Sequence, residues 1–273
     1  MDIFQAARAN TGRHKEQYQA ALEAADEATA ALLAAFVESV LHDGNLSINM
    51  RVFVAENFMS GSPYENIYEF CDRMSRLSGR DAADIIKERL GPYCERRLKF
   101  DASRPEFKLV YYAALNIGGA GATKYGEICV VLGRCLEADG RRAAYLRGDS
   151  LNDYFDAAAG ADMPRLLTDI CAETDRAYLA VIKHAGEIPR TERAGWETLV
   201  CSNASYIEAI FDVRPAKQEV SEIRVPVASY DALWDIAFAD FSRRLASAEK
   251  ALANDFIQLL DAAGTARIQV RPV

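Results

Sequence analysis

The apolar positions at both ends of the chain recur at helical spacing. Over residues 3–41, alanine, leucine, phenylalanine and valine side chains repeat every three or four positions until Asp43-Gly44-Asn45. A similar stripe returns over residues 229–262. Because this period places apolar side chains on one face of a helix, it predicts a long helix at each end. The first helix is expected to break or kink at Thr11-Gly12.

The middle of the chain changes to a strand-like pattern. Leu46, Ile48 and Met50 alternate with polar side chains, which predicts a half-buried strand over residues 45–54. Short runs rich in β-branched and aromatic residues predict further strands. These runs are 108–117, 127–133, 143–147, 196–201, 207–213, 222–227 and a last short one at 266–270.

The order of these elements predicts an α+β fold, with a central, mostly antiparallel β core flanked by long N- and C-terminal helices. We expect an N-terminal helical segment at 1–43, a mixed core at 44–228, and a C-terminal helix at 229–273 that packs on the same domain. Further helices are expected at 62–77, opened by a capping-box spacing of Ser62 and Glu65, at 81–90 and at 163–185.

Composition narrows the class of protein. The chain has 273 residues, of which 50% are hydrophobic and 26% charged. This balance is typical of a globular protein and too apolar for a disordered chain. No apolar run approaches the roughly 18 residues of a membrane span, so no membrane association is expected. The first residues lack the order of a signal peptide, which favours the cytoplasm, or delivery into a host cell by another route.

Charge bears on the kind of partner. The net charge is -8, and no strongly basic stretch is visible, so strong nucleic-acid binding is not expected. Residues 44–100 are the slightly basic exception, with nine basic and eight acidic side chains. Two or three arginines there could hold a small anionic ligand.

The residues that often carry hydrolytic or metal chemistry form no recognised motif. The chain has neither a G-x-S-x-G elbow nor an H-E-x-x-H pair, and its cysteines form no C-x-x-C pair. We expect the cysteines to be reduced core residues and no metal to be bound. The cysteines are Cys71, Cys94, Cys129, Cys135, Cys171 and Cys201.

A glycine-rich segment follows the predicted strand 108–117. Residues 116–124 read NIGGAGATK, but the order of Gly, Thr and Lys does not match a phosphate-binding loop, and the glycine spacing does not match a dinucleotide fingerprint. The segment is either a flexible connection between strands or a loop whose backbone a ligand can approach.

Three segments together resemble ADP-ribosyltransferases. They are Arg51 on the predicted strand 45–54, the run ATKYGEICVVL at 122–132, and the run WETLVCSNASYIEAIF at 196–211. A second resemblance is to a bacterial domain family whose function is not known. It rests on Arg104-Pro105, YAALNIGG at 112–119, KYGEICVVL at 124–132 and the turn Arg147-Gly148-Asp149-Ser150.

The first resemblance implies a set of roles. Arg51 would bind the dinucleotide phosphates of NAD, Tyr112 and Tyr125 would surround the nicotinamide, Thr123 would lie near the ribose, and Glu197 would be the catalytic carboxylate. It also implies a bacterial toxin or effector that modifies a protein or another macromolecule. Gly195 stands where the family has an acceptor-orienting residue, so an arginine acceptor is not predicted.

The chemistry of NAD cleavage suits a carboxylate, an arginine and aromatic side chains. Breaking the bond between nicotinamide and ribose produces an oxocarbenium-like sugar, which a carboxylate stabilises. An arginine fork suits the phosphates, and an aromatic face suits the departing ring.

Purely structural roles for these residues, and functions other than ADP-ribosyl transfer, stay open. Arg51 is also typical of a solvated strand residue, the tyrosines of sheet aromatics, and Glu197 of an outward strand carboxylate. Asp149 and Ser150 most simply cap a helix. Two alternative classes of protein remain: a non-enzymatic helical interaction or adaptor protein, and a hydrolase that uses a Cys or a carboxylate.

Overall fold

The centre of the molecule is a β-sheet. The computed structural model describes residues 2–133, 142–239 and 245–273, and within these ranges eight strands form one sheet in the order β10-β9-β3-β1-β2-β8-β4-β7. Every neighbouring pair is antiparallel except β9 and β10. The predicted α+β class with a mostly antiparallel core is confirmed. The strands are β1 Asn45–Met50, β2 Tyr111–Asn116, β3 Ile128–Leu132, β4 Ala143–Leu146, β7 Cys171–Ala172, β8 Glu208–Phe211, β9 Val220–Val225 and β10 Gln269–Pro272.

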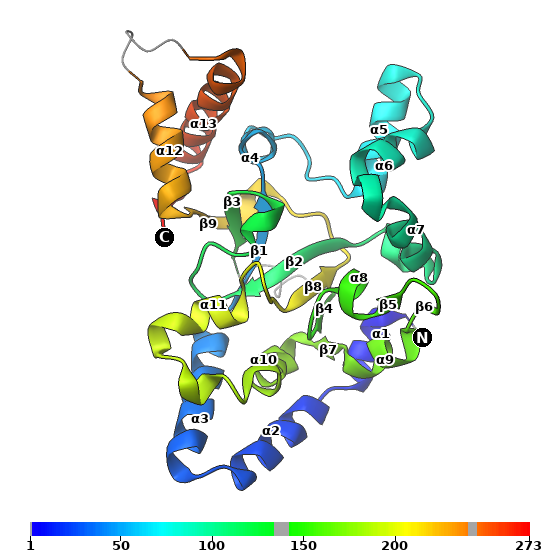
Figure 1. The fold of residues 1–273 in the computed structure, drawn as a ribbon, viewed down its shortest axis with the longest axis vertical. Helices are drawn as coiled ribbons and strands as arrows, with labels where there is room; N and C mark the ends of the chain where they lie inside the picture. The colour runs from blue at the N-terminus through cyan, green and yellow to red at the C-terminus, as the bar shows by residue number, and fades with distance from the viewer. Residues whose placement is uncertain (1, 134–141, 240–244) are drawn as a thin grey trace.

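Helices surround this sheet (Figure 1). No helix in the described part of the chain combines the length and the apolar character that crossing a bilayer requires. A small hairpin, β5 Phe155–Asp156 and β6 Gly160–Ala161, and short 3-10 turns such as η1 Gly91–Tyr93 and η3 Thr123–Tyr125 complete the fold. The α-helices are α1 Ile3–Ala9, α2 Arg13–Ala24, α3 Glu27–Asp43, α4 Val52–Met59, α5 Ile67–Ser78, α6 Ala82–Leu90, α7 Cys94–Ala102, α8 Ser150–Asp153, α9 Met163–Asp169, α10 Arg176–His184, α11 Trp196–Val200, α12 Val227–Ala237 and α13 Ser247–Thr265.

The register divides the sheet into two unlike faces, because residues paired across antiparallel strands point to the same side. On one face Ile48, Val130 and Ile223 form a row inside the main hydrophobic core, with side chains from α3, α4, α10 and α13. On the other face a second core under α1, α7 and α9 covers only the β4 and β8 end. The middle of that second face carries small and polar side chains and holds the candidate site.

The predicted N-terminal helix is three helices. The chain turns at Gly12, whose φ of 88° lies in the left-handed region that glycine adopts without strain, so the break at Thr11-Gly12 is confirmed. A second break, at Ala25-Asp26, was not predicted. There Asp26 accepts a hydrogen bond from the backbone N–H of Thr29 and caps α3. The expected end at Asp43 is correct.

The predicted strand 45–54 was too long. β1 ends at Met50, and Arg51 is the N-cap of α4. The carboxylate of Glu127 accepts a hydrogen bond from the backbone N–H of Val52 at 3.2 Å. This contact from a distant residue satisfies a donor at the helix start, and local alternation along the chain does not reveal it.

Four other boundaries differ from the predictions. Segment 196–201 is not a strand but contains the helix α11, which buries Trp196 and Val200, four positions apart. The helix predicted at 62–77 begins only at Ile67, where Asn66 and Glu69 form the capping box in place of Ser62 and Glu65. β7 divides the predicted helix 163–185 into α9 and α10. In place of one predicted helix at 229–262 there are two, α12 and α13, and residues 240–244 lie outside the described ranges.

The remaining strand predictions and the helix at 81–90 are confirmed to within a few residues. They include the last strand, β10, which adds to the edge of β9 in parallel. The two C-terminal helices α12 and α13 pack against each other, and α13 also packs against α4 (Figure 1).

Candidate functional site

A cavity of about 750 Å³ lies on the polar face of the sheet. Its floor comes from β1, β2 and β8, where Ser47, Ala114 and Glu208 are paired across neighbouring strands. Its walls come from η3, the start of α8 and the segment from α6 to α7. The small side chains of Ser47 and Ala114 leave space above the sheet, and the volume is in the range of small-molecule sites.

Glu208 provides a carboxyl group to this cavity from β8. The residue is only 6% exposed, and its Oε1 accepts a hydrogen bond from the backbone N–H of Ser150 at 3.3 Å. Burial and the nearby charge of Asp149 raise the pKa of Glu208 to about 8. Glu208 is therefore mostly protonated at neutral pH and gains its charge in mildly alkaline solution.

Asp149 stands beside Glu208 in the opposite protonation state. It caps α8, as the sequence predicted, by accepting hydrogen bonds from the backbone N–H groups of Leu151 and Asn152. The hydroxyl groups of Tyr206 and Tyr125 donate to its Oδ2 at 2.5 and 3.1 Å. Burial opposes the charge, but these hydrogen bonds outweigh it and lower the pKa of Asp149. Neighbouring carboxyl groups with opposite pKa shifts are typical of acid–base sites.

A cationic and aromatic wall faces these carboxyl groups. The Arg97 guanidinium lies 4.6 Å from the ring centroid of Tyr112, and its Nε donates to Asp101 at 2.6 Å. Tyr93 and Tyr125 are 61% and 51% exposed and present flat apolar surfaces. The cavity therefore suits a ligand that has both a planar ring and an anionic group.

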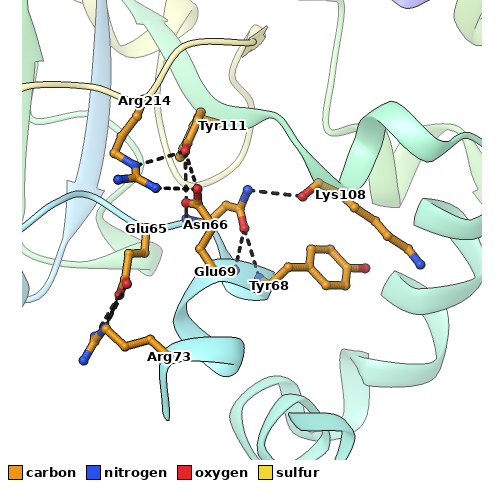
Figure 2. Close-up of polar contacts among 8 residues, drawn as sticks. All are labelled: Glu65, Asn66, Tyr68, Glu69, Arg73, Lys108, Tyr111 and Arg214. Carbon is orange, nitrogen blue, oxygen red and sulfur yellow. Dashed lines mark hydrogen bonds and ion pairs between the residues drawn. The ribbon is translucent and has the colours of Figure 1, made fainter. Parts of the chain in front are cut away.

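Three side chains, named the α5 clamp, hold α5 against the sheet (Figure 2). They are Glu69 on α5, Tyr111 on β2 and Arg214 on the loop after β8. The carboxylate of Glu69 accepts hydrogen bonds from the Tyr111 hydroxyl at 2.9 Å and from Arg214 Nη2 at 2.6 Å. Arg214 Nε also donates to the Tyr111 hydroxyl at 3.2 Å. Because α5 packs on α6, and α6 packs on α7, the clamp helps to set where Arg89 on α6 and Arg97 on α7 stand at the cavity.

Most of the residues predicted from the sequence lie at or beside the cavity. Arg51, Tyr112 and Tyr125 line it. Arg51 is exposed at the N-terminus of α4. Thr123 does not line the cavity, although it is next to Lys124, which does. The Thr123 hydroxyl accepts a hydrogen bond from Asn203 Nδ2 at 2.8 Å.

The structure does not bring Glu197 to this cavity. Glu197 is half-buried on α11 and packs against the glycine-rich segment, where a Cβ added to Gly118 would lie 2.5 Å from its Oε2. It is not among the residues that line the cavity. The carboxyl group beside the predicted tyrosines belongs instead to Glu208, on the strand that follows.

The glycine-rich segment is closed onto the sheet. The fully buried side chain of Asn116 donates to the Gly119 carbonyl and accepts from the Gly118 N–H, both at 2.9 Å. Gly121 has a φ of 73°, and a Cβ there would lie 2.2 Å from Oδ1 of Asn49. The missing side chains at Gly118 and Gly121 thus allow close packing of the backbone, whereas Ala122 and Lys124 at the end of the segment line the cavity.

The cysteines are poor candidates for a nucleophile. The five described ones are buried and free of disulfides, and Cys135 lies outside the described residues. Burial raises the pKa of Cys129 to about 11 and that of Cys201 to about 12, which disfavours the reactive thiolate. In the ranges that the structure describes, no three or more His, Cys, Asp or Glu side chains are arranged to hold a metal ion.

Sequence reasoning missed Glu208, Tyr206 and Arg97. A signal for Glu208 was present, because a carboxylate stands inside the apolar run IEAIF of a predicted strand. A carboxylate at such a position either points to solvent or is buried with polar partners, and the pattern alone does not distinguish the two cases. Arg97 lies in a charged helix and gave no signal.

The fold and the site define an α+β protein with a cavity that holds two carboxyl groups whose pKa values are shifted in opposite directions. The chain matches no family model and no curated protein. The chemistry of the cavity is therefore the basis on which a function is assigned.

Proposed function

We propose that this protein is an NAD-dependent mono-ADP-ribosyltransferase whose catalytic carboxylate is Glu208. The observation that carries the proposal is the convergence of Glu208 with Tyr112, Tyr125 and Arg51 in one cavity. The acceptor would be a protein or another macromolecule, as for a bacterial toxin or effector. The protein would act in the cytoplasm, or in a host cell into which it is delivered.

The proposed reaction breaks the bond between the nicotinamide nitrogen and C1′ of the ribose. Nicotinamide leaves as a neutral molecule with the electron pair of that bond, and an acceptor nucleophile forms a bond to C1′ and gives up its proton. The ionised fraction of Glu208, which grows as the pH rises above neutral, stabilises the positive charge that develops on the ribose. With a pKa of about 8, Glu208 is also basic enough to take the acceptor proton.

Other cavity residues have supporting roles in this proposal. Tyr125 and Tyr112 provide ring surfaces for nicotinamide, and Arg97, fixed by Asp101, orients Tyr112. Asp149 holds the hydroxyl groups of Tyr125 and Tyr206 in place through its two hydrogen bonds. This rigid arrangement would position the ribose before the bond breaks.

The decisive experiment compares two glutamates that the resemblance and the structure distinguish. Glu208→Gln keeps the size of the side chain and removes the charge, so we expect nicotinamide release from NAD, in the presence of acceptor lysate, to fall about 100-fold or more. Glu197→Gln is the matched control and should stay within a few-fold of the native rate. Nicotinamide and modified products are measured by mass spectrometry.

Unchanged NAD cleavage by a folded Glu208→Gln variant would rule out the proposed carboxylate. If Glu197→Gln were the only variant to lose NAD cleavage, the catalytic carboxylate would be Glu197 on α11. If the native protein releases no nicotinamide and modifies nothing in lysates, the proposed activity is wrong.

A carboxylate hydrolase is the second candidate, and the split between Glu208 and Asp149 favours it specifically. Neutral Glu208 would donate a proton to a leaving group, and ionised Asp149 would activate water. Asp149→Asn separates the two candidates, because it should abolish hydrolysis but only weaken ribosyl transfer.

A further inference from the structure

A second, smaller cavity of about 340 Å³ adjoins the first one. The two cavities share Lys124, Asp149, Asn152 and Tyr206 as a common wall. Arg147, just after β4, and Lys183, on α10, line only the smaller cavity. A ligand that passes along the shared wall can therefore reach both groups of side chains.

Positive charge dominates the lining of the smaller cavity. Four cationic side chains line it against two carboxylates, Asp149 and Asp153. The hydrogen bonds to Asp149 already come from Tyr125, Tyr206 and the start of α8. The four cationic residues are Lys124, Arg147, Arg165 and Lys183.

Three of these cations form no ion pair within 4 Å of a carboxylate in the described part of the chain, and the charge of Asp153 acts on Lys183 from a greater distance. Only Arg165 forms an ion pair, with Asp169 at 3.7 Å. Lys183 Nζ donates to the backbone carbonyl of Tyr206 at 2.6 Å, and the ammonium group of Lys124 lies over the rings of Tyr125 and Tyr206. An excess of cations over carboxylates in one recess favours an anionic ligand.

The burial of Lys183 agrees with this geometry. Removing its ammonium group from water lowers the pKa of Lys183 to about 8. An anion in the cavity would compensate for this loss of hydration and keep the ammonium charged.

We infer that the smaller cavity binds the diphosphate of the substrate, while the reacting ribose lies across the shared wall at Glu208. The identity of the substrate rests on the proposed function. The inference also moves the phosphates from Arg51, where the resemblance placed them, to Arg147 and Lys183. Arg51 is exposed at the N-terminus of α4 and lines only the larger cavity.

Calorimetric titration of the full chain with inorganic pyrophosphate and with ADP-ribose tests the inference without any turnover. We expect Arg147→Gln and Lys183→Gln each to raise the Kd for both ligands about tenfold. Arg8→Gln, an exposed charge-matched control that lines neither cavity, should leave Kd unchanged. Circular dichroism verifies that each variant is folded, and because Arg147 is exposed its substitution leaves the core intact.

Unchanged binding in both Arg147→Gln and Lys183→Gln would overturn the subsite, and so would a loss confined to Arg51→Gln. The proposed function can fail separately. If pyrophosphate binding depends on Arg147 and Lys183 but NAD is never cleaved, the diphosphate subsite is confirmed and the proposed ADP-ribosyltransferase activity is wrong. If both variants cleave NAD with an unchanged KM, the proposed activity is confirmed and the diphosphate subsite is wrong.

Discussion

At the scale of single residues, Glu208 binds its proton more tightly in the folded protein than in the unfolded chain. Burial and the charge of Asp149 raise its pKa from 4.5 to about 8. Its contribution to stability is therefore fully present below pH 4.5 and is lost as the pH rises to about 8. Asp149 has the opposite sign, because its lowered pKa adds stability that is lost only in acid.

This linkage gives a prediction for stability against pH. We expect Glu208→Gln to be more stable than the native protein at about pH 9 by roughly 2–5 kcal/mol, with little of that difference left near pH 5. Denaturant unfolding at the two pH values measures both free energies. Glu197→Gln serves as the control on a half-buried glutamate, and parallel profiles for Glu208→Gln and native protein would contradict a buried, protonated Glu208.

At the scale of elements, side-chain hydrogen bonds attach the α5–α6 pair to the rest of the molecule, among them the α5 clamp and the bond from the Tyr68 hydroxyl to Asp101. Its small hydrophobic cluster, which includes Cys71, Ile85 and Ile86, is separate from the two larger cores. The pair extends away from the sheet in Figure 1, at the upper right. The α5 clamp is therefore an important anchor, and through α6 it also affects one wall of the larger cavity.

Removing one hydroxyl group tests this anchor. Tyr111→Phe keeps the ring that packs near Phe211 but deletes the hydrogen bonds that the Tyr111 hydroxyl makes in the α5 clamp, while the Glu69–Arg214 ion pair remains. We expect a loss of about 1 kcal/mol in stability, faster hydrogen exchange in α5 and α6, and a higher KM for the substrate, because Arg89 and Arg97 become less fixed.

The matched control is Arg73→Gln, which breaks the Glu65–Arg73 ion pair in the same region (Figure 2). That pair joins α5 to the segment just before it and not to the sheet, so exchange should stay close to native. Equal exchange rates in native protein and Tyr111→Phe would show that the α5 clamp is not the anchor.

At the scale of the whole molecule, the main hydrophobic core draws on both ends of the chain. It contains Tyr18 from α2 and Phe36 from α3 at one end, and Phe256 and Leu259 from α13 at the other. The backbone N–H of Val273 also donates to the carbonyl of Val225 at 2.9 Å, next to the β9–β10 pair. The terminal segments thus complete the core under the sheet.

We therefore predict that the isolated segment 44–228 does not fold, whereas the full chain unfolds in one cooperative transition. Without α3 and α13, the apolar face of the sheet would be exposed to water, at a cost of about 25 cal/mol for each Å². Circular dichroism and amide spectra of the segment measure this directly. A cooperative melt of the segment with a native-like spectrum would show that 44–228 is an independent domain.

The sequence by itself determined most of the local structure. β2, β3 and β8 follow from β-branched and aromatic runs, α6 lies where a helix at 81–90 was predicted, and the break at Gly12 follows from the conformational freedom of glycine. Asp149 was also predicted correctly as a cap. These features depend on residues close together along the chain, which is why local patterns reveal them.

Only the tertiary structure decided which carboxyl group enters the cavity. The alternation within the run 207–213 shows that Glu208 points to the opposite face of the sheet from Ile207 and Ala209. It does not show which of the two faces other elements cover. Ile207 and Ala209 join the main core, and this turns Glu208 to the opposite face, where Asp149 and Ser150 reach it from distant segments. The burial of Glu208 and its raised pKa depend on contacts between segments far apart in the chain, which periodicity does not encode.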